Sequence, residues 1–260
     1  GISFNVQTGR GIAALMPVHV FGNAADLRGL VGLCRDRGIR LLEDASESLG
    51  SWYRNPDGSS THTGLVGELG CLSFNGNKIV TTGAGGMIIA EADDLAARAR
   101  YLTTQAKDDA AHYVHHEVGY NYRMSNVNAA IGVAQMEKLP RYLEAKRRIH
   151  ELYSELLADD DHYQVAPVPS YADNNLWLTA VQIRDGSPRE RDAELNRMAA
   201  AGIECRPLWY LNHWQRPYAR CNHYRIERAP ELWERTINVP SGVDLTERQV
   251  RRVVAELKRG

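Results

Sequence analysis

Two stretches of the sequence place polar side chains directly after an apolar segment. Glu43, Asp44 and Glu47 follow the first, in "LLEDASES", and Ser73 and Lys78 follow the second, in "SFNGNK". In doubly wound sheets, ligands bind beyond the carboxyl ends of the strands. A carboxylate at one strand end and a lysine at another therefore suggest either an ion pair or a catalytic site. Taken alone, each has a plainer explanation, because acidic strand ends often cap helices and lysines usually face water.

The elements that would position these residues alternate between strand and helix patterns. Strand patterns occur at residues 11–22, 39–45, 71–78 and 85–91. Between the first two, residues 25–38 repeat apolar residues at helical spacing and end at Gly38, which suits a helix stop. This order predicts a βαβ unit with a parallel sheet and a right-handed crossover. Turn-forming residues at 55–70 predict an excursion or a hairpin.

Helical patterns dominate the middle of the chain, at residues 92–104, 126–140 and 141–160. Residues 105–125 are polar and loop-like. Strand and helix patterns alternate again after residue 160 and end in a helix that Thr246 is expected to cap. We therefore predict a large α/β domain over residues 1–140, a connecting long helix over 141–160, and a small α+β domain over 161–260.

Composition argues against several classes of protein. The chain has 31 basic and 32 acidic side chains, so no strongly basic surface for nucleic acid is expected. No run approaches the ~20 apolar residues of a membrane span, and the first residues lack the apolar region of a signal peptide. Four scattered cysteines favour a reducing, cytoplasmic location. His112, His115 and His116 lack a spaced carboxylate or cysteine partner, so we expect no metal site.

Four motifs occur in order along the chain and carry more information together than singly. They are "PVHVFG", "EDASESLGSWY", "GCLSFNGNKIVTTGAGGMI" and "VGYNYRMSNVNAAIGVAQMEKL". Together they resemble the DegT/StrS family of sugar aminotransferases, which use pyridoxal phosphate on a fold-type-I scaffold. The later segments "GIECRPLW" and "INVPSGVDLTERQV" are similar to that family as well. The resemblance covers essentially the whole chain and implies an α/β fold with a mixed, mostly parallel sheet between helices.

The resemblance implies roles for the residues of a cofactor site. Lys78 would bond to pyridoxal phosphate as a Schiff base, which requires a neutral amine, although a free lysine has a pKa near ~10.4. Asp44 would keep the pyridinium nitrogen protonated, so that the ring withdraws electrons. Ser73 would bind the cofactor phosphate, and Asn121 would reach the phosphate of the neighbouring subunit in a homodimer. Arg123, close by, is either a further site residue or part of a structural ion pair.

Other residues are expected near the cofactor or the substrate. Glu47 stands where many family members have glutamine, beside the cofactor's phenolic oxygen, and a carboxylate there would repel a phenolate unless one of the two is protonated. His19 is expected either to bind substrate or to lie buried against the backbone. Arg206 and His213 would lie near the nucleotide sugar, with Arg206 as a bidentate diphosphate ligand and Trp209 as packing. The variants "EDASES" and "FNGNK" resemble the branch that acts on UDP-linked 4-keto sugars.

Family members usually carry a further N-terminal part, which supplies a phosphate-binding turn at a helix N-terminus and an aromatic residue that stacks on the cofactor. We therefore expect the chain to be a fragment, with a degenerate homologue as the alternative. The implied activity is transfer of an amino group, with glutamate as the expected donor, to a nucleotide-linked 4-keto-6-deoxy sugar.

Three alternatives to this activity remain open. The first is a non-catalytic protein that binds the same cofactor. The second is a dinucleotide-binding enzyme, which is weaker because "TGAGGM" lacks both the spacing and the place of a GxGxxG turn. The third is a sugar dehydratase of the same family, which would carry histidine in place of Lys78.

Overall fold

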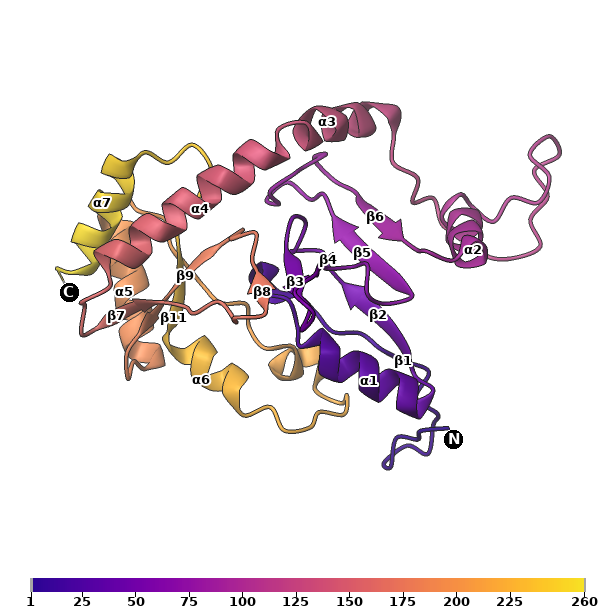
Figure 1. Cartoon of the computed structure of the whole chain (residues 1–260), viewed down its shortest axis with the longest axis horizontal. Helices are drawn as coiled ribbons and strands as arrows, with labels where there is room; N and C mark the ends of the chain where they lie inside the picture. The colour runs from indigo at the N-terminus through magenta and orange to yellow at the C-terminus, as the bar shows by residue number, and fades with distance from the viewer. Residues whose placement is uncertain (1, 260) are drawn as a thin grey trace. The chain divides into compact units, whose positions relative to one another are not determined.

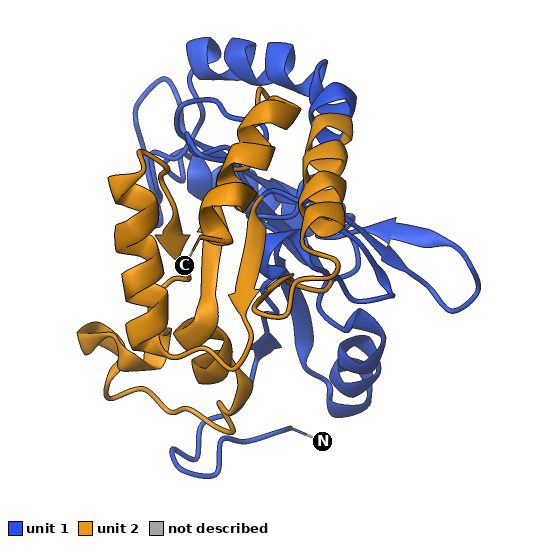
Figure 2. Cartoon of the chain, turned by 90° about the vertical axis from the view of Figure 1, so that its left-hand side faces the viewer, with its two compact units in different colours: residues 1–143, 168–177 blue, residues 144–167, 178–260 orange. Residues whose placement is uncertain are grey.

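The computed structural model describes residues 2–259, which form two compact units (Figures 1 and 2). The first unit comprises residues 1–143 and 168–177, and the second comprises residues 144–167 and 178–260. This division differs from the predicted one, because the boundary lies inside helix α4 (Leu139–Leu156) and a later segment returns to the first unit. Helix α4 also begins before the predicted residue 141, since Pro140 occupies its first turn, where a missing N–H is tolerated.

A mixed sheet of four strands positions the polar residues of the first unit. Its order is β1 (Ala14–Leu15), β2 (Arg40–Asp44), β5 (Leu69–Ser73) and β6 (Gly86–Ile89). The first three strands run parallel to one another, and β6 runs antiparallel to β5. Figure 1 shows helix α1 (Leu27–Arg37) between β1 and β2 in the chain, as the predicted βαβ unit requires. Asp26 caps this helix, and Gly38 ends it with a left-handed φ of 62°.

The apolar run at residues 11–22 forms less strand than we predicted. Strand β1 is limited to Ala14–Leu15, Val18 adds an isolated parallel bridge to Asp44 of β2, and Val20–Gly22 form a short 3-10 helix, η1. Met16 and Val18 are 59 % and 44 % exposed. Because β1 is an edge strand of this sheet, an apolar sequence there does not by itself secure burial on both faces.

The predicted excursion after β2 is a hairpin. Strands β3 (Trp52–Arg54) and β4 (Ser60–His62) pair antiparallel around a turn that Asn55 closes by donating its N–H to the Ser59 carbonyl. Strand β8 (Ala172–Asp173) pairs with the other edge of β3. This pairing is one of the contacts that join residues 168–177 to the first unit.

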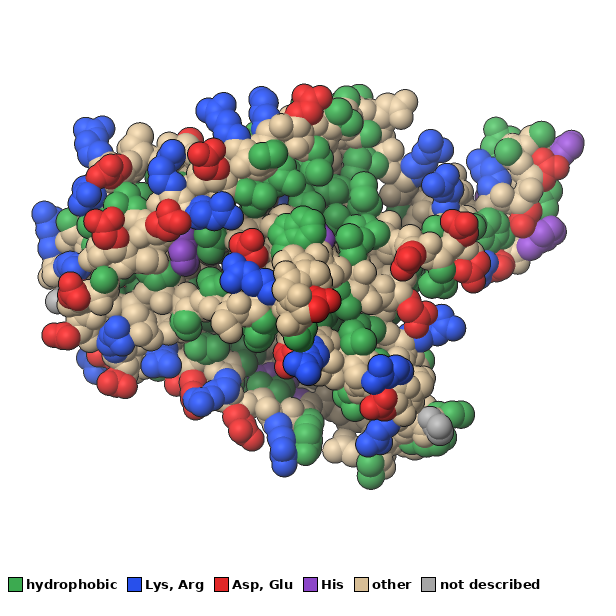
Figure 3. Space-filling view, in the orientation of Figure 1, with side chains coloured by type: hydrophobic (Ala, Val, Ile, Leu, Met, Phe, Trp, Pro, Cys, Tyr) green, Lys and Arg blue, Asp and Glu red, His purple; other side chains and the backbone are tan. Residues whose placement is uncertain are grey.

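Two helices of the first unit have no buried residue. They are α2 (Asp93–Thr103) and α3 (Asn126–Met136), which Ser125 caps at its N-terminus. The space-filling view shows hydrophobic side chains gathered near α3 (Figure 3), and Val127 and Val133 are 73 % and 62 % exposed. No helix in the described part of the chain is long and apolar enough to cross a membrane.

The second unit packs helices on an antiparallel sheet. The sheet order is β10 (Arg206–Pro207), β11 (Thr236–Val239), β9 (Thr179–Ile183) and β7 (Tyr163–Val165). Its further helices are α5 (Pro188–Ala200), α6 (Arg228–Arg235), α7 (Glu247–Leu257) and the short η2 (Asn212–Trp214) and η3 (Arg216–Tyr218). Tyr153, Val181 and Val250 are fully buried in its core. Thr246 forms a capping box with Gln249, as its place before the last helix predicts.

Candidate active site

The amine of Lys78 lies between an aromatic ring and a carboxylate. Its Nζ is 4.1 Å from the centroid of the Trp177 ring and 4.0 Å from Oε1 of Glu47. The side chains of Lys78 and Glu47 are each 14 % exposed. Burial lowers the pKa of the Lys78 amine, although Glu47 and Asp44 act in the opposite direction. An amine in this environment loses its proton, and becomes nucleophilic, closer to neutral pH.

Buried residues on both sides fix the loop that carries Lys78. Phe74 and Val80 are 6 % and 1 % exposed and flank the turn "NGNK". Within the turn, the N–H of Lys78 donates to the Asn75 carbonyl at 3.1 Å, and the N–H of Thr82 donates to the Phe74 carbonyl at 3.0 Å. Lys78 therefore lies in a hydrogen-bonded turn that is flanked by two buried residues, Phe74 and Val80.

Trp177 reaches this loop from a distant part of the sequence. Its Nε1–H donates to the Asn77 carbonyl at 2.7 Å, and its side chain is nearly fully buried. Asn175 accepts the Trp177 N–H and donates its Nδ2 to the Glu47 carbonyl at 2.8 Å. Neither residue is among the predicted site residues, because "NNLWLTAVQI" has the pattern of a strand and lies outside the motifs that predict the site.

Glu47 faces Lys78 because a backbone amide holds its other oxygen. The N–H of Phe21 donates to Glu47 Oε2 at 2.8 Å, and Phe21 has a left-handed φ of 56°. Burial raises the pKa of the Glu47 carboxyl, while Phe21 and Lys78 oppose the shift and Asp44 adds to it. The carboxyl therefore holds a proton more readily than an exposed glutamate does.

Asp44 and Ser73 end neighbouring strands of the sheet. Asp44 Oδ1 accepts the N–H of Ser46 at 3.1 Å, and Ser73 Oγ accepts the N–H of Asn75 at 3.3 Å. Strands β2 and β5 are adjacent and parallel, so their carboxyl ends meet at one edge of the sheet. The structure thus brings four predicted residues to this edge. They are Asp44, Glu47, Ser73 and Lys78.

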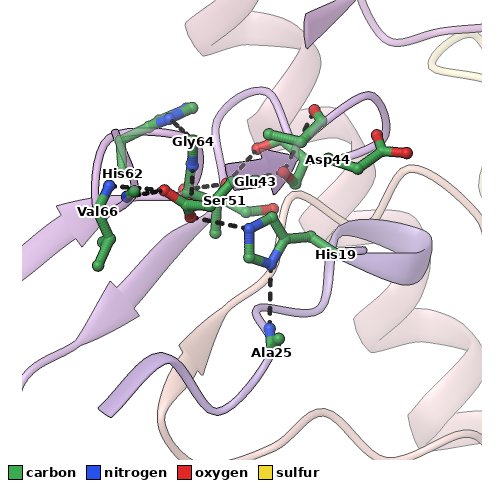
Figure 4. A network of polar contacts seen from close by, with 12 residues as sticks. His19, Ala25, Glu43, Asp44, Ser51, His62, Gly64 and Val66 are labelled. Atoms are coloured by element: carbon green, nitrogen blue, oxygen red, sulfur yellow. Dashed lines mark hydrogen bonds and ion pairs between the residues drawn. The ribbon is translucent and has the colours of Figure 1, made fainter. Parts of the chain in front are cut away.

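His19 does not lie where a substrate contact would require it. Its side chain is fully buried, Nδ1 accepts the N–H of Ala25 at 3.0 Å, and Nε2 lies 3.0 Å from Glu43 Oε2 (Figure 4). Because Nδ1 is an acceptor, we assign the ring proton to Nε2, which donates to Glu43. The expected substrate contact is therefore corrected: His19 matches the alternative of a buried histidine satisfied within the protein.

Glu43 is a buried carboxylate with four hydrogen-bond donors. Besides His19, it accepts the N–H groups of Gly64 at 2.9 Å, Val66 at 2.7 Å and Gly67 at 2.6 Å. Burial acts to raise the pKa of the Glu43 carboxyl, but these hydrogen bonds outweigh it and the net pKa is lowered. Glu43 and Asp44 are consecutive strand residues and point to opposite faces, so Glu43 supports the sheet edge from the side away from Asp44.

The remaining predicted residues lie elsewhere. Asn121 is exposed and forms an isolated bridge with Thr104. Arg123 is also exposed and follows Tyr122 in the chain, whose ring stacks on that of Tyr120. The proposed roles of Asn121 and Arg123 stay predictions.

Arg206 and His213 belong to the second unit. Arg206 is exposed and pairs with Glu204, and the His213 ring lies 5.3 Å from the Trp214 ring. Trp209, which we expected to pack, is 51 % exposed. Their predicted contacts with a nucleotide sugar stay predictions.

The histidines of the loop at 105–125 have local partners. His112 Nδ1 lies 2.8 Å from Asp109 Oδ2, and His115 Nδ1 lies 2.7 Å from the Gln105 carbonyl. Across residues 2–259, no group of three or more His, Cys, Asp or Glu side chains is arranged to hold a metal ion.

The groups at the sheet edge fit the functional groups of pyridoxal phosphate. The Lys78 amine has no hydrogen bond to any described residue, which leaves it available to a carbonyl carbon. Asp44 Oδ2 likewise has no partner among residues 2–259 and can face a protonated ring nitrogen. The Ser73 hydroxyl can donate to a phosphate oxygen. The residue chemistry is thus compatible with an aldehyde, a pyridinium and a phosphate.

Comparison with known proteins agrees with this chemistry. The model of the DegT/DnrJ/EryC1/StrS aminotransferase family matches residues 5–258. EpsN of Bacillus subtilis is 36 % identical over 249 residues, which cover 94 % of this chain and 62 % of EpsN. A GDP-perosamine synthase of Caulobacter vibrioides is 35 % identical over 245 residues, which cover 94 % of this chain and 65 % of that enzyme.

Solved structures give the same result. The structure of DesI in the presence of its TDP-sugar product superposes with a TM-score of 0.85 at 27 % identity, covering 95 % of this chain and 62 % of DesI. The aminotransferase TlmJ from Streptoalloteichus hindustanus superposes with a TM-score of 0.85 at 26 % identity, covering 95 % of this chain and 65 % of TlmJ. The chain therefore spans slightly less than two thirds of the length of these relatives.

Proposed function

The chain belongs to the DegT/DnrJ/EryC1/StrS aminotransferase family, and from this premise we propose that it carries the catalytic lysine of a pyridoxal phosphate-dependent aminotransferase acting on a nucleotide-linked keto sugar. The observation that carries the proposal is the Lys78 amine, held between Trp177 and Glu47 with a lowered pKa. Relatives support the substrate class, because one is a GDP-perosamine synthase and another was solved with its TDP-sugar product.

Three residues would hold the cofactor. Lys78 would bind its aldehyde carbon, Asp44 its ring nitrogen and Ser73 its phosphate. When bound, pyridoxal phosphate supplies a ring that withdraws electrons from the carbon that bears the amino group. The carboxylate of Asp44 is suited to hold a proton on the ring nitrogen, since opposite charges favour the protonated form.

Lys78 and its neighbours would also move protons. Once free, the neutral Lys78 amine can take a proton from the carbon that bears the amino group and return it at a later step. Glu47, 4.0 Å from Nζ, stabilises the protonated form of that amine. The Trp177 ring covers one side of the amine and excludes water there.

We further propose the identities of the two substrates and the assembly. The amino acceptor is a 4-keto-6-deoxy sugar on a nucleoside diphosphate, the donor is glutamate, and Arg206 and His213 bind the nucleotide part. The active form is a homodimer in which Asn121 reaches the cofactor phosphate of the neighbouring subunit. An assay with UDP-, GDP- and dTDP-linked 4-keto sugars and glutamate tests the acceptor and the donor. An amino sugar formed with alanine but not with glutamate would contradict the choice of donor.

Trapping of the cofactor tests the central proposal. We expect added pyridoxal phosphate to give a visible absorbance band, and borohydride reduction to leave one adduct on the peptide that contains Lys78. The variant Lys78→Ala should lose both, while Lys138→Ala, which removes an exposed lysine of the same unit, should keep both. An adduct spread over other lysines, or a band that survives Lys78→Ala, would overturn the proposal.

A further inference from the structure

The buried pair of His19 and Glu43 has no part in the proposed chemistry, yet it joins three segments beside the site (Figure 4). His19 lies in the turn after β1, Glu43 lies near the end of β2, and Gly64 lies in the loop before β5. A buried carboxylate with four donors is costly to disturb, because each donor left unpaired would also lose its partner. The pair therefore fixes these segments relative to one another.

The turn at residues 19–25 is closed around the His19 ring. Nδ1 of His19 accepts the N–H of Ala25 at 3.0 Å, and the His19 carbonyl accepts the N–H of Gly22 at 3.1 Å. The backbone of His19 is itself tied to the sheet, since its N–H donates to the Asp44 carbonyl at 3.1 Å. Phe21 sits in the middle of this turn, and its left-handed φ of 56° turns its N–H toward Glu47.

We propose that His19 and Glu43 are positioning residues for Glu47: the buried pair holds the turn at 19–25, and the Phe21 amide of that turn holds the Glu47 carboxylate toward Lys78. This proposal depends on the proposed function only in taking Lys78 as the catalytic lysine. The hydrogen bonds from the Ala25 N–H to His19 Nδ1 and from the Phe21 N–H to Glu47 Oε2 are observed whether or not that function is correct.

The charged groups around the site give the direction of the effect. Glu47 faces Lys78 and lies near Asp44, whereas Glu43 faces His19 and lies near His62. The Phe21 amide favours the charged form of Glu47, and charged Glu47 favours the protonated form of Lys78. When the turn loosens, the Glu47 carboxylate is no longer held 4.0 Å from Nζ, so the protonated amine loses a stabilising charge and Lys78 should lose its proton at a lower pH.

A double-mutant cycle tests this inference on the full chain without cofactor. Pulses of acetic anhydride at a series of pH values, read by mass spectrometry, give the pH at which Lys78 becomes half reactive. We expect His19→Phe to lower that pH by about 0.5–1 unit. Glu47→Gln should lower it too, and His19→Phe should then add no further shift in the Glu47→Gln background. The exposed Lys138 of the same unit serves as the internal reference.

A purely structural role predicts a different result. His19→Phe would then leave the Lys78 midpoint unchanged, or would shift it equally in both backgrounds, and either outcome overturns the inference. If His19→Phe does not fold, hydrogen exchange on the unmodified chain decides. The Phe21 and Ala25 amides should exchange through an opening of the same free energy. A Phe21 amide that exchanges freely beside a protected Ala25 amide would overturn the inference.

These outcomes are separate from those of the proposed function. A missing pyridoxal phosphate adduct on Lys78 would remove the catalytic task of the lysine. The labelling cycle would still report whether His19 acts on Lys78 through Glu47, because acetic anhydride needs only a neutral amine.

Discussion

At the scale of single residues, burial decides what two lysines of this chain can do. Lys78 is partly buried beside Trp177 and Glu47, and burial lowers the pKa of its amine. Lys146, in the second unit, is 6 % exposed, and its Nζ lies 3.4 Å from Ser241 Oγ. Burial lowers the pKa of Lys146 to about 8. Lys78 lies among the polar residues at the carboxyl edge of the first unit's sheet, whereas Lys146 is buried inside the second unit.

Lys146 should give the second unit a pH-dependent stability. Its folded pKa of about 8 lies below the ordinary 10.5, so the unfolded chain binds more protons between these values. The free energy of unfolding should therefore rise as the pH increases from about 8 to 10.5, by up to about 3 kcal/mol from this group.

Urea denaturation of wild type and Lys146→Met at several pH values measures this contribution as the difference between the two proteins. The difference should change across this pH range, while Lys138→Met, at an exposed lysine, should show none. A constant difference for Lys146→Met would contradict the assignment.

Trp177 should control both the stability of the first unit and the reactivity of Lys78. Trp177→Ala removes a buried ring and should lower the free energy of unfolding by about 3–5 kcal/mol. Because burial is the main cause of the lowered pKa of Lys78, the same change should raise the pH at which Lys78 becomes reactive.

Trp177→Phe is the matched control for this change. It keeps an aromatic ring, although a smaller one, and loses the N–H that donates to the Asn77 carbonyl, so both effects should be smaller than in Trp177→Ala. Denaturation and the acetic anhydride titration measure them. A Lys78 midpoint that does not move in Trp177→Ala would show that the ring does not shield the amine.

At the scale of elements, the turn after β1 depends on one glycine. Gly22 has a φ of 81°, and a Cβ added there would lie 2.1 Å from Asn175 Oδ1 and 2.5 Å from Asn174 Oδ1. Asn175 in turn places Trp177 and bonds to the Glu47 carbonyl. The turn and the segment at 174–177 can therefore pack only if position 22 has no side chain.

Gly22→Ala should destabilise the first unit by about 2–4 kcal/mol, because both the left-handed φ and the close approach of Asn175 oppose a side chain. Gly32→Ala is the matched control. Gly32 lies inside helix α1 with no atom within 4 Å of an added Cβ, so alanine should stabilise the chain by about 0.5–1 kcal/mol. Chemical denaturation compares the two, and equal effects would contradict this account.

At the scale of the whole molecule, the proposed homodimer makes a testable statement about Asn121. If Asn121 of one subunit completes the site that contains Lys78 of the other, then Lys78→Ala and Asn121→Ala remove residues that different subunits contribute to the same site. Mixing the two variants should then restore about a quarter of the sites by random assortment of subunits. Cofactor titration of the mixture, after dissociation and reassociation, measures the restored sites. Binding that stays at the level of the separate variants would place Asn121 in its own subunit's site, or in none.

Local signals in the sequence were enough for most elements of the fold. Helix α1 ends at Gly38 as predicted, the hairpin of β3 and β4 forms in the predicted turn-rich stretch, and Thr246 caps the last helix. Caps, turns and helical periodicity depend on neighbours within a few residues, so a single sequence contains them. The run at 11–22 was over-predicted, because apolar residues alone do not show that a strand lies at an edge.

The sequence by itself determined the family and the order of motifs around Lys78, since both depend only on residue identity and spacing. Only the tertiary structure decided that Trp177 covers the lysine amine, that the Phe21 amide holds Glu47, and that His19 is buried on Glu43. Those contacts join segments far apart in the chain, and they form only after the sheet and its turns have packed.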